Sequence, residues 1–213
     1  MIDTKQYIVL GPQGSGKGTQ AKVLAQLLGV PHISTGDMFR DQAHRGTELG
    51  LKAQQLMNQG KLVPDEVTNA MVQDKLAEPD AANGFVFDGY PRNLNQAEFL
   101  NSLVPGVCAL ELRLSDDEAV QRIAGRRVCE SCGENYHIQF APSKNNKSCD
   151  KCGGRLVQRA DDTEQSVRTR LGTYHKATEP LLNYYESRGL LTSVDGSPAI
   201  SEVTKSIRVA LQL

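Results

Sequence analysis

The most specific chemistry in the sequence lies near its N-terminus, in the segment GPQGSGKGT at residues 11–19. Its spacing matches the phosphate-binding pattern G-x-x-x-x-G-K, in which glycines let several backbone N–H groups point at one anion. Lys17 is a compact charge that can reach terminal phosphates. The residue after it is Gly18, and the hydroxyl that often binds Mg²⁺ comes one position later, at Thr19. The loop predicts a nucleoside-triphosphate site and leaves direct hydroxyl ligation of Mg²⁺ open.

Asp88 is a second candidate, because it ends the apolar run 84–87. In open α/β sheets the carboxyl ends of strands face the ligand crevice, so this carboxylate is placed to orient Mg²⁺ through water. A helix-capping role is the alternative interpretation. The next residues are Gly89-Tyr90-Pro91-Arg92, which bring a guanidinium close to that carboxylate.

Arginine is concentrated in the second half of the chain. Seven of the thirteen fall between positions 122 and 170, namely Arg122, Arg126, Arg127, Arg155, Arg159, Arg168 and Arg170. Arginine forms bidentate contacts with phosphate, and phosphoryl transfer needs several cations around the migrating group. Any one of them could be a solvated helix-surface charge, but the cluster as a whole favours phosphate chemistry.

Four of the five cysteines form two C-x-x-C pairs. Cys129 and Cys132 are separated by sixteen residues from Cys149 and Cys152, and a glycine follows each pair. This is a four-thiolate zinc spacing, and four thiolates with no open position indicate a structural metal rather than a catalytic one. Two disulfides are the alternative. Cys108 lies apart and is expected to be an inert buried thiol.

Strands alternate with helices along most of the chain, which indicates an α/β protein with a parallel sheet. We expect strands at 7–10, 32–34, 84–88, 109–114 and 190–194, and helices at 19–28, 37–58, from 64, at 161–187 and at the C-terminus. The rhythm breaks at 127–159, where Gly, Asn, Ser and Cys accumulate, and at 35–63, where helices follow one another without a strand. We interpret the first break as an inserted small module.

Composition excludes several classes of protein. The 213 residues include 39% apolar and 23% charged positions, which is typical of a globular protein. A net charge of −1 argues against a uniformly basic nucleic-acid-binding surface. The sequence has no signal-peptide pattern and no run of 18 apolar residues, so we expect a cytoplasmic protein with no membrane segment.

Together these residues resemble the adenylate kinase family, in its bacterial long form with a zinc-bearing lid. The resemblance covers essentially the whole chain. Its markers are GPQGSGKGT at 11–19, ISTGDM at 33–38, GKLV at 60–63, FDGYPR at 87–92, RIAGRR at 122–127, and Asp161-Asp162 with Arg168 and Arg170. Glycine after the loop lysine is itself a family feature, whereas Tyr90 stands where the family usually has Phe.

The resemblance implies a P-loop core with a five-stranded parallel sheet, a helical insertion that binds the nucleoside monophosphate, and a small zinc-ribbon-like lid. The corresponding boundaries are 1–33, 64–125 and 164–213 for the core, 34–63 for the AMP-binding insertion and 126–163 for the lid. It also implies reversible phosphoryl transfer from Mg-ATP to AMP, giving two ADP, by a protein that is commonly a monomer.

The same resemblance implies roles for individual residues. Those implied for ATP are Gly14, Ser15, Gly16, Lys17, Gly18, Thr19, Arg122, Arg126, Asn135, Tyr136 and Pro198. Those implied for AMP are Thr35, Arg40, Lys61, Leu62, Val63, Gly89, Tyr90, Pro91, Arg92, Gln96, Arg159 and Arg170. Catalysis would fall to Lys17, Asp88, Arg92, Arg126, Arg159 and Arg170, by positioning and charge neutralisation rather than by a covalent nucleophile.

Two other functions compete with this one. A UMP/CMP-type kinase is disfavoured by Gln96, by Thr35 and by the long lid. A zinc-ribbon ATPase that binds nucleic acid is disfavoured because the acidic and basic residues between Cys129 and Cys152 balance, and binding to a phosphate backbone needs excess cation.

Overall fold

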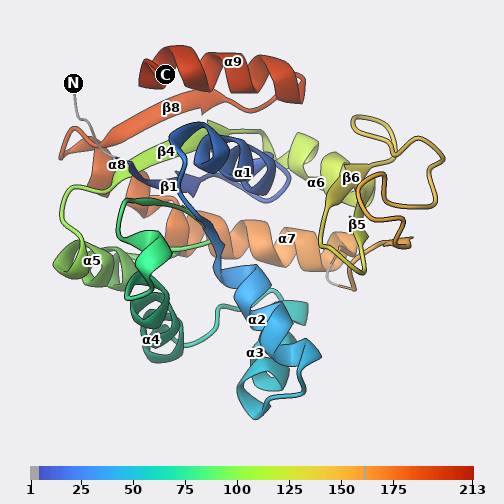
Figure 1. Ribbon diagram of the computed structural model, residues 1–213, viewed down its shortest axis with the longest axis horizontal. Coiled ribbons are helices and arrows are strands. Elements are labelled where there is room, and N and C mark those ends of the chain that lie inside the picture. The colour runs from blue at the N-terminus through green and yellow to red at the C-terminus, as the bar shows by residue number, and fades with distance from the viewer. Residues whose placement is uncertain (1–4, 161) are drawn as a thin grey trace.

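The structure is a computed structural model that describes residues 5–160 and 162–213. At its centre is a five-stranded parallel sheet in the order β2-β3-β1-β4-β8, with helices on both faces (Figure 1). The strands are β1 (Gln6–Leu10), β2 (His32–Ser34), β3 (Phe85–Asp88), β4 (Cys108–Arg113) and β8 (Leu191–Asp195). All five strands expected from the sequence are confirmed, each to within one residue at its ends.

The helices connect these strands in the crossover manner that parallel pairing requires. They are α1 (Lys17–Leu28), α2 (Thr35–His44), α3 (Glu48–Asn58), α4 (Asp65–Leu76), α5 (Leu94–Leu103), α6 (Asp116–Ala124), α7 (Glu164–Thr173), α8 (Pro180–Glu186) and α9 (Ile200–Leu211), with a 3₁₀ turn at Pro79–Ala81. Among the described residues, none of these helices combines the length and apolar character needed to cross a bilayer.

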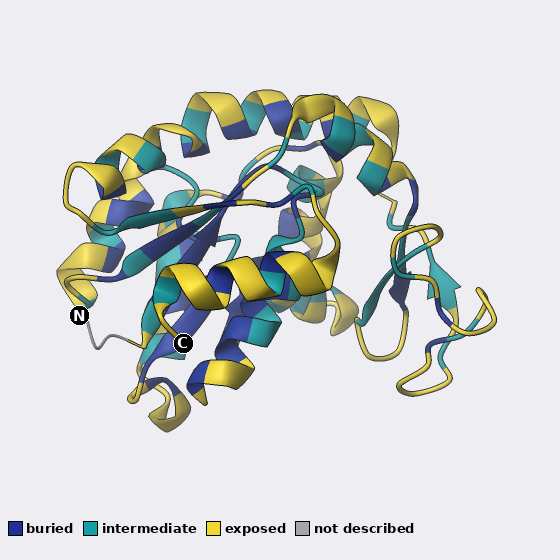
Figure 2. Cartoon of the chain, turned by 90° about the horizontal axis from the view of Figure 1, so that it is seen from above, coloured by how far each residue is buried: buried dark blue, intermediate teal, exposed yellow. Residues whose placement is uncertain are grey.

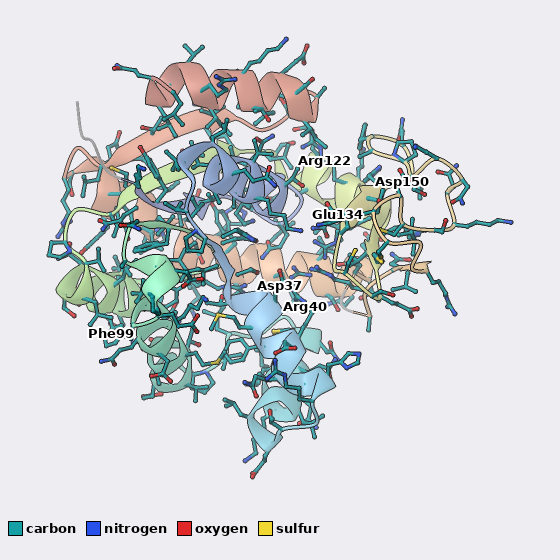
Figure 3. All side chains as sticks on the ribbon, in the orientation of Figure 1. Asp37, Arg40, Phe99, Arg122, Glu134 and Asp150 are labelled. Carbon is teal, nitrogen blue, oxygen red and sulfur yellow. The ribbon has the colours of Figure 1, made fainter. Side chains whose placement is uncertain are left out.

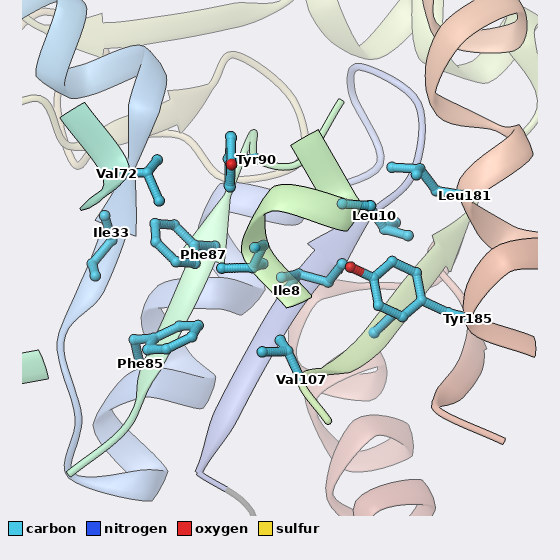
Figure 4. Close-up of a cluster of buried hydrophobic side chains, with 13 residues drawn as sticks. Ile8, Leu10, Ile33, Val72, Phe85, Phe87, Tyr90, Val107, Leu181 and Tyr185 are labelled. Carbon is cyan, nitrogen blue, oxygen red and sulfur yellow. The ribbon is translucent and has the colours of Figure 1, made fainter. Parts of the chain in front are cut away.

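The sheet is buried on both faces, and the alternation of side chains along β1 builds two cores. Ile8 and Leu10 belong to a cluster with Phe85, Phe87 and side chains of α5 and α8 (Figure 4). Tyr7 and Val9 point to the opposite face, where α1 and α9 cover the sheet. Burial is concentrated in the sheet and in the helix surfaces against it, as Figure 2 shows. The strands that carry the site are therefore rigidly held.

The insertion is a pair of helices, α2 and α3, rather than the single helical stretch predicted over 37–58. The helical stretch is interrupted at Gly46, whose φ is 71°. Thr47 is the N-cap of α3, and its hydroxyl oxygen accepts the backbone N–H of Gly50 at 3.1 Å. The two helices cross closely, since a Cβ at Gly50 would lie 2.2 Å from Gln42 and Ala43 backbone atoms. This pair has a small core of its own, formed by Phe39, Ala53 and Val63.

The lid is a three-stranded antiparallel sheet in the order β6-β5-β7. Its strands are β5 (Arg126–Cys129), β6 (Asn135–His137) and β7 (Leu156–Val157). Most of its side chains are exposed or half-buried (Figure 2), including Ile138 and Phe140. The lid therefore has little apolar core of its own to stabilise it.

The long helix predicted over 161–187 is divided into three parts. Thr163 caps α7 by accepting the Ser166 backbone N–H at 3.2 Å. Residues Tyr174–Thr178 then form a π-helical turn, and α8 begins at Pro180. Proline has no N–H to donate to the α-helical hydrogen-bond ladder. The N–H of the preceding residue, Glu179, donates to the carbonyl of Tyr174, five residues back, which is the spacing of a π-helix. Asp161, the first residue of the predicted segment, lies outside the described residues.

Candidate active site

A cavity of about 540 Å³ opens where the carboxyl ends of the central strands meet the phosphate loop, the insertion and the lid. The parallel register sets Ser34 of β2 and Val9 of β1 beside Asp88 of β3 at this edge. The predicted site residues that line the cavity are Gly14, Gly16, Lys17, Gly18, Thr19, Arg40, Lys61, Leu62, Asp88, Gly89, Pro91, Arg92, Arg122, Arg126, Asn135, Tyr136, Arg159, Arg170 and Pro198.

The phosphate loop turns between β1 and α1, and its shape depends on glycine. Gly14 and Gly16 have φ angles of 86° and 88°, a left-handed conformation that residues with a Cβ rarely adopt. Gly16 is the N-cap of α1, and no side chain caps this helix start. The first N–H groups of α1 are therefore available to an anion, and the helix end adds positive potential there.

Lys17 begins α1 and is half-buried. Its Nζ donates to the carbonyl of Pro12 at 2.7 Å. Burial lowers the pKa of Lys17 to about 7; the Asp88 carboxylate opposes this, and the charges of Arg92, Arg170 and Arg126 add to it. The structure thus brings into one field the lysine, the carboxylate and three of the arginines predicted to be catalytic. Such a concentration of cations around one carboxylate is typical of a phosphate site.

The glycine after Lys17 has a structural reason. A Cβ built on Gly18 would lie 3.1 Å from Oδ2 of Asp88, so the carboxylate at the end of β3 approaches the first turn of α1. A serine or threonine at position 18 would crowd that carboxylate. The departure from the usual loop pattern therefore makes room for Asp88.

Two arginines are held by a buried carboxylate that the sequence analysis gave no role. Asp162 accepts two hydrogen bonds from Arg126, one of them from Nε at 2.9 Å. Arg170 Nη1 lies 3.7 Å from the same carboxylate. The Asp162 side chain is fully buried, whereas the two arginines reach the cavity. In the sequence, Asp162 was noted only as part of the Asp161-Asp162 marker of the family resemblance.

The segment after β3 is fastened at several points around Arg92. The Arg92 Nε donates to the carbonyl of Gly89 at 2.7 Å. Its backbone carbonyl accepts the hydroxyl of Thr178 at 2.8 Å, from the π-helical turn. Thr35, at the start of α2, donates to the carbonyl of Gly89 at 2.9 Å. These contacts fix the Arg92 guanidinium beside the cavity.

Five of the predicted site residues lie beneath the cavity wall instead of lining it: Ser15, Thr35, Val63, Tyr90 and Gln96, none more than 9% exposed. Tyr90 is part of the hydrophobic core, and its hydroxyl donates to Asn69 Oδ1 at 2.7 Å. The side-chain oxygen of Gln96 accepts the Arg92 backbone N–H at 2.7 Å, and its Nε2 donates to Asp65 at 2.8 Å. In this geometry both ends of that amide are engaged within the protein.

On the insertion side, α2 contributes Asp37 and Arg40, which form an ion pair at 2.5 Å (Figure 3). Burial tends to raise the pKa of Asp37, but Arg40 and the more distant Arg159 together hold it below its usual value. Since Arg159 belongs to the lid segment, its field extends across the cavity to the insertion. Residues of α7 also contact the insertion, because Thr173 donates to the carbonyl of Gly60 at 3.3 Å.

On the lid side, Arg122 lies in the last turn of α6. Its guanidinium donates to the carbonyls of Gly196 at 2.8 Å and Ser197 at 2.5 Å, next to Pro198. The same guanidinium lies 5.7 Å from the ring centre of Phe140, a cavity-lining residue that the sequence analysis did not assign. Its signal would have been an exposed aromatic residue in a polar lid.

The four paired cysteines meet in the lid. Their Sγ atoms all lie within 4.8 Å of one another, with Cys129 and Cys152 at 3.5 Å and Cys132 and Cys149 at 3.6 Å. A tetrahedral zinc site with Zn–S bonds of about 2.3 Å has S···S edges of about 3.8 Å, so the spacing fits a four-thiolate metal. The four cysteines thus form a cluster that could bind a metal ion.

Neighbouring groups favour ionised sulfur at two of these positions. A hydrogen bond from Tyr136, with backbone N–H groups of Lys151 and Cys152, lowers the pKa of Cys149 to about 6 against the effect of burial. Burial is likewise outweighed at Cys129, whose pKa is lowered by backbone N–H groups. The backbone N–H of Gly154 lowers the pKa of Cys152, but hydrogen bonds with the sulfurs of Cys132 and Cys129 outweigh this effect. They raise the pKa of Cys152 to about 12, because they favour its protonated form.

Comparisons with known proteins agree with this geometry. A model of the family described as adenylate kinase matches residues 9–190. The chain is 47% identical to an adenylate kinase of Acetivibrio thermocellus over 211 residues, which covers 97% of each chain. It is 48% identical to adenylate kinases of Moorella thermoacetica and Streptomyces coelicolor, again over 97% of this chain and 97% and 98% of theirs. The chain belongs to the adenylate kinase family.

Proposed function

We propose that the chain uses the cavity at the carboxyl ends of its central strands for both substrates of the reversible reaction ATP + AMP = 2 ADP, with each wall of the cavity binding a different part of the substrates. The observation that carries this assignment is that Lys17 shares one cavity with Asp88 and with three arginines whose charges act on it, namely Arg92, Arg126 and Arg170. Phosphoryl transfer needs positioning and charge neutralisation more than covalent chemistry, and these groups supply both.

ATP would occupy the side formed by the phosphate loop and the lid. The backbone of residues 14–19 would bind its phosphates, and Lys17 would contact the terminal ones. Asn135 and Tyr136 of β6, with Arg122 and Pro198, would enclose the adenosine end. Once phosphates neutralise the neighbouring arginines, Lys17 no longer faces uncompensated positive charge and is protonated.

AMP would occupy the insertion side. Arg40 and Arg92 would bind its phosphate, and Lys61 and Leu62 would line the pocket at the end of α3. Gly89 and Pro91 would form the wall nearest β3. Thr35, Val63, Tyr90 and Gln96 would support that wall from beneath, where their burial places them.

The transferring phosphoryl group would lie between the two substrates, bound by Arg126, Arg159 and Arg170. All three line the cavity, and Asp162 orients two of them. Fixed cations stabilise the charge that develops during transfer without having to reorient at that moment.

Magnesium fits the acidic edge of the same cavity. Asp88 is the carboxylate next to the phosphate loop, and Mg²⁺ is typically held by one or two carboxylates, substrate phosphates and water. When bound, the ion neutralises charge on the ATP phosphates. Asp88 would orient the ion through water. Because Gly18 has no Cβ, the space beside the Asp88 carboxylate stays open.

Zinc suits the lid cluster, because four thiolates in a tetrahedral arrangement leave no position for substrate. Cys129, Cys132, Cys149 and Cys152 would hold it as a structural ion. The small apolar content of the lid makes the metal its main source of stability. A monomeric state, a cytoplasmic location and the lack of a nucleic-acid partner stay predictions that the fold does not test.

A coupled assay of ADP formation tests the proposed reaction. The purified chain is incubated with Mg-ATP and one of AMP, UMP, CMP or GMP, and each pair is repeated with a chelator in place of Mg²⁺. We expect rapid ADP formation with AMP, at least about 100-fold faster in kcat/KM than with the pyrimidines, and almost none without Mg²⁺. Comparable rates with UMP or CMP would contradict the assignment of the insertion to AMP.

A further inference from the structure

The hydroxyl of Tyr136 joins two parts of the lid that have different tasks. It accepts the backbone N–H of Asp150 at 2.8 Å and lies 3.4 Å from Sγ of Cys149. Because the N–H already donates to the oxygen, the hydroxyl proton is available to the sulfur. Tyr136 therefore donates an O–H···S hydrogen bond to one of the four cysteines while its oxygen is anchored to the residue that follows.

Tyr136 belongs to the strand that faces the nucleotide cavity. All three residues of β6, Asn135, Tyr136 and His137, line that cavity. The strand also pairs with β5, with His137 opposite Arg126 in the register. A displacement of β6 would therefore change the wall predicted to enclose ATP and the strand that carries an arginine of the transfer site.

A second contact between the loop at 149–152 and this part of the lid is an ion pair next to β6. Lys151 reaches Glu134 at 3.8 Å, but the lysine is 69% exposed, and such pairs contribute little. A phenylalanine at position 136 would pack as well as tyrosine, so packing does not explain the hydroxyl. Both of its partners, Cys149 and Asp150, lie in the C-x-x-C segment of the second cysteine pair, which points to a connection between the metal site and the cavity.

We propose that Tyr136 is a positioning residue through which the metal in the lid sets the ATP side of the cavity. Its hydroxyl orients Cys149 as a ligand, and the same bond holds β6 against the metal-binding loop. Hydrogen bonds to ligand atoms from the surrounding protein are known to orient ligands and strengthen metal binding. The inference rests on the structural metal site proposed above.

The test compares Tyr136→Phe with the wild-type chain and with Tyr184→Phe, a matched loss of one hydroxyl on α8, outside the lid. Metal affinity is measured by competition with a chromogenic chelator, and KM is measured separately for ATP and AMP. For Tyr136→Phe we expect metal affinity to fall about 10- to 100-fold. We expect KM for ATP to rise about three- to tenfold at saturating metal, with KM for AMP nearly unchanged. Tyr184→Phe changes neither quantity.

Cobalt provides a spectroscopic readout that general loss of stability would not produce. Co²⁺ replaces the metal in both proteins, and the sulfur-to-cobalt charge-transfer band is recorded. A hydrogen bond withdraws charge from sulfur, so its loss in Tyr136→Phe should move the band to longer wavelength.

The possible results separate the two levels of the proposal. A wild-type chain that forms ADP but binds no stoichiometric metal would overturn the structural metal site, and the role of Tyr136 with it. Stoichiometric metal in the wild type, with unchanged affinity and an unchanged cobalt band in Tyr136→Phe, would overturn the role of Tyr136 alone. Weaker metal binding with an unchanged KM for ATP would overturn the link to the cavity.

Discussion

The fully buried carboxylate of Asp162 forms two hydrogen bonds with the guanidinium of Arg126. Because Arg170 also lies 3.7 Å from this carboxylate, one acidic group orients two of the cations assigned to the transferring phosphoryl group. It also offsets part of their mutual repulsion. The proposed arrangement of these cations therefore depends on a residue that does not itself line the cavity.

Asp162→Asn is expected to lower kcat about 10- to 100-fold, because small misplacement of catalytic groups is costly. KM for both nucleotides should change much less, since the arginine charges remain. The variant should also unfold at a lower temperature, since the half-buried guanidinium of Arg126 loses the charge of its carboxylate partner. Glu164→Gln is the control, because Glu164 pairs with Arg168 on the exposed surface. Full activity in Asp162→Asn would contradict the positioning role.

Lys17→Met should remove most activity while making the nucleotide-free protein more stable near neutral and acidic pH. The loss of one charged donor to the phosphates is expected to lower kcat by about 10²–10³. The melting temperature without nucleotide should not fall, because Lys17 serves phosphates rather than the core. Activity within about threefold of wild type would contradict the phosphate assignment.

The stability effect of Lys17 has a definite pH dependence. The pKa of Lys17 falls to about 7 in the folded state, below its ordinary value of 10.5, so the unfolded chain binds more protons between these values. The contribution of Lys17 to stability therefore improves as pH rises through this window. Lys17→Met lacks that dependence, so it should exceed wild type by about 1 kcal/mol or more at about pH 6 and by progressively less towards pH 10. Urea unfolding at several pH values measures this difference, and a constant difference would exclude the pKa shift.

Gly18→Ala is expected to disturb magnesium use. The new Cβ would lie 3.1 Å from Oδ2 of Asp88 and would displace the carboxylate by a few tenths of an ångström. We expect the Mg²⁺ concentration for half-maximal activity to rise about three- to tenfold, with a smaller change in KM for AMP. Gly172→Ala is the matched control, because a Cβ on this exposed residue of α7 meets no atom within 4 Å. Equal behaviour of the two variants in a Mg²⁺ titration would be incompatible with the role of Asp88.

Gln96→Ala should weaken the binding of AMP by about 1–3 kcal/mol and the binding of ATP by much less. The family resemblance implies an AMP-binding role for Gln96, but in the structure its amide accepts the Arg92 N–H and donates to Asp65. Removal of this amide would loosen the segment that carries Arg92 and so weaken the contact proposed between Arg92 and the AMP phosphate. Separate KM measurements for the two nucleotides check this. A similar loss of affinity for both would place Gln96 outside the AMP side.

Replacing Cys149 and Cys152 together by Ser should abolish stoichiometric metal and lower the melting temperature clearly. The lid has few buried apolar side chains, so its ordering depends on the metal. No cysteine is among the residues lining the cavity within the described chain, so a sizeable fraction of activity should persist at low temperature. Elemental analysis, thermal melting and ADP formation are measured on the same sample. An unchanged melting temperature would refute the structural role, and normal melting with total loss of catalysis would indicate a catalytic metal.

Local patterns in the sequence were enough to predict the strands, the phosphate loop and the cysteine cluster. Each is specified over a short distance: apolar runs such as Phe85–Phe87 form buried strands, and glycines at 14 and 16 set the loop. The C-x-x-C spacing is likewise local in each half. Helix limits were less accurate, because the breaks at Gly46 and before Pro180 depend on single turns within an otherwise continuous helical pattern.

The remaining features depend on contacts between residues far apart in the chain. Sequence could predict that Gln96 and Tyr90 matter, but only the fold shows that they lie beneath the cavity wall. The pairing of Asp162 with Arg126, and of Tyr136 with Cys149, joins residues 36 and 13 positions apart across an irregular lid. The reduced pKa of Lys17 likewise arises from arginines contributed by other segments of the chain. The sequence alone determined which chemical groups are present and the local turns that expose them. Their distances and electrostatic fields were decided by the tertiary structure, because both depend on how separate elements pack against one another.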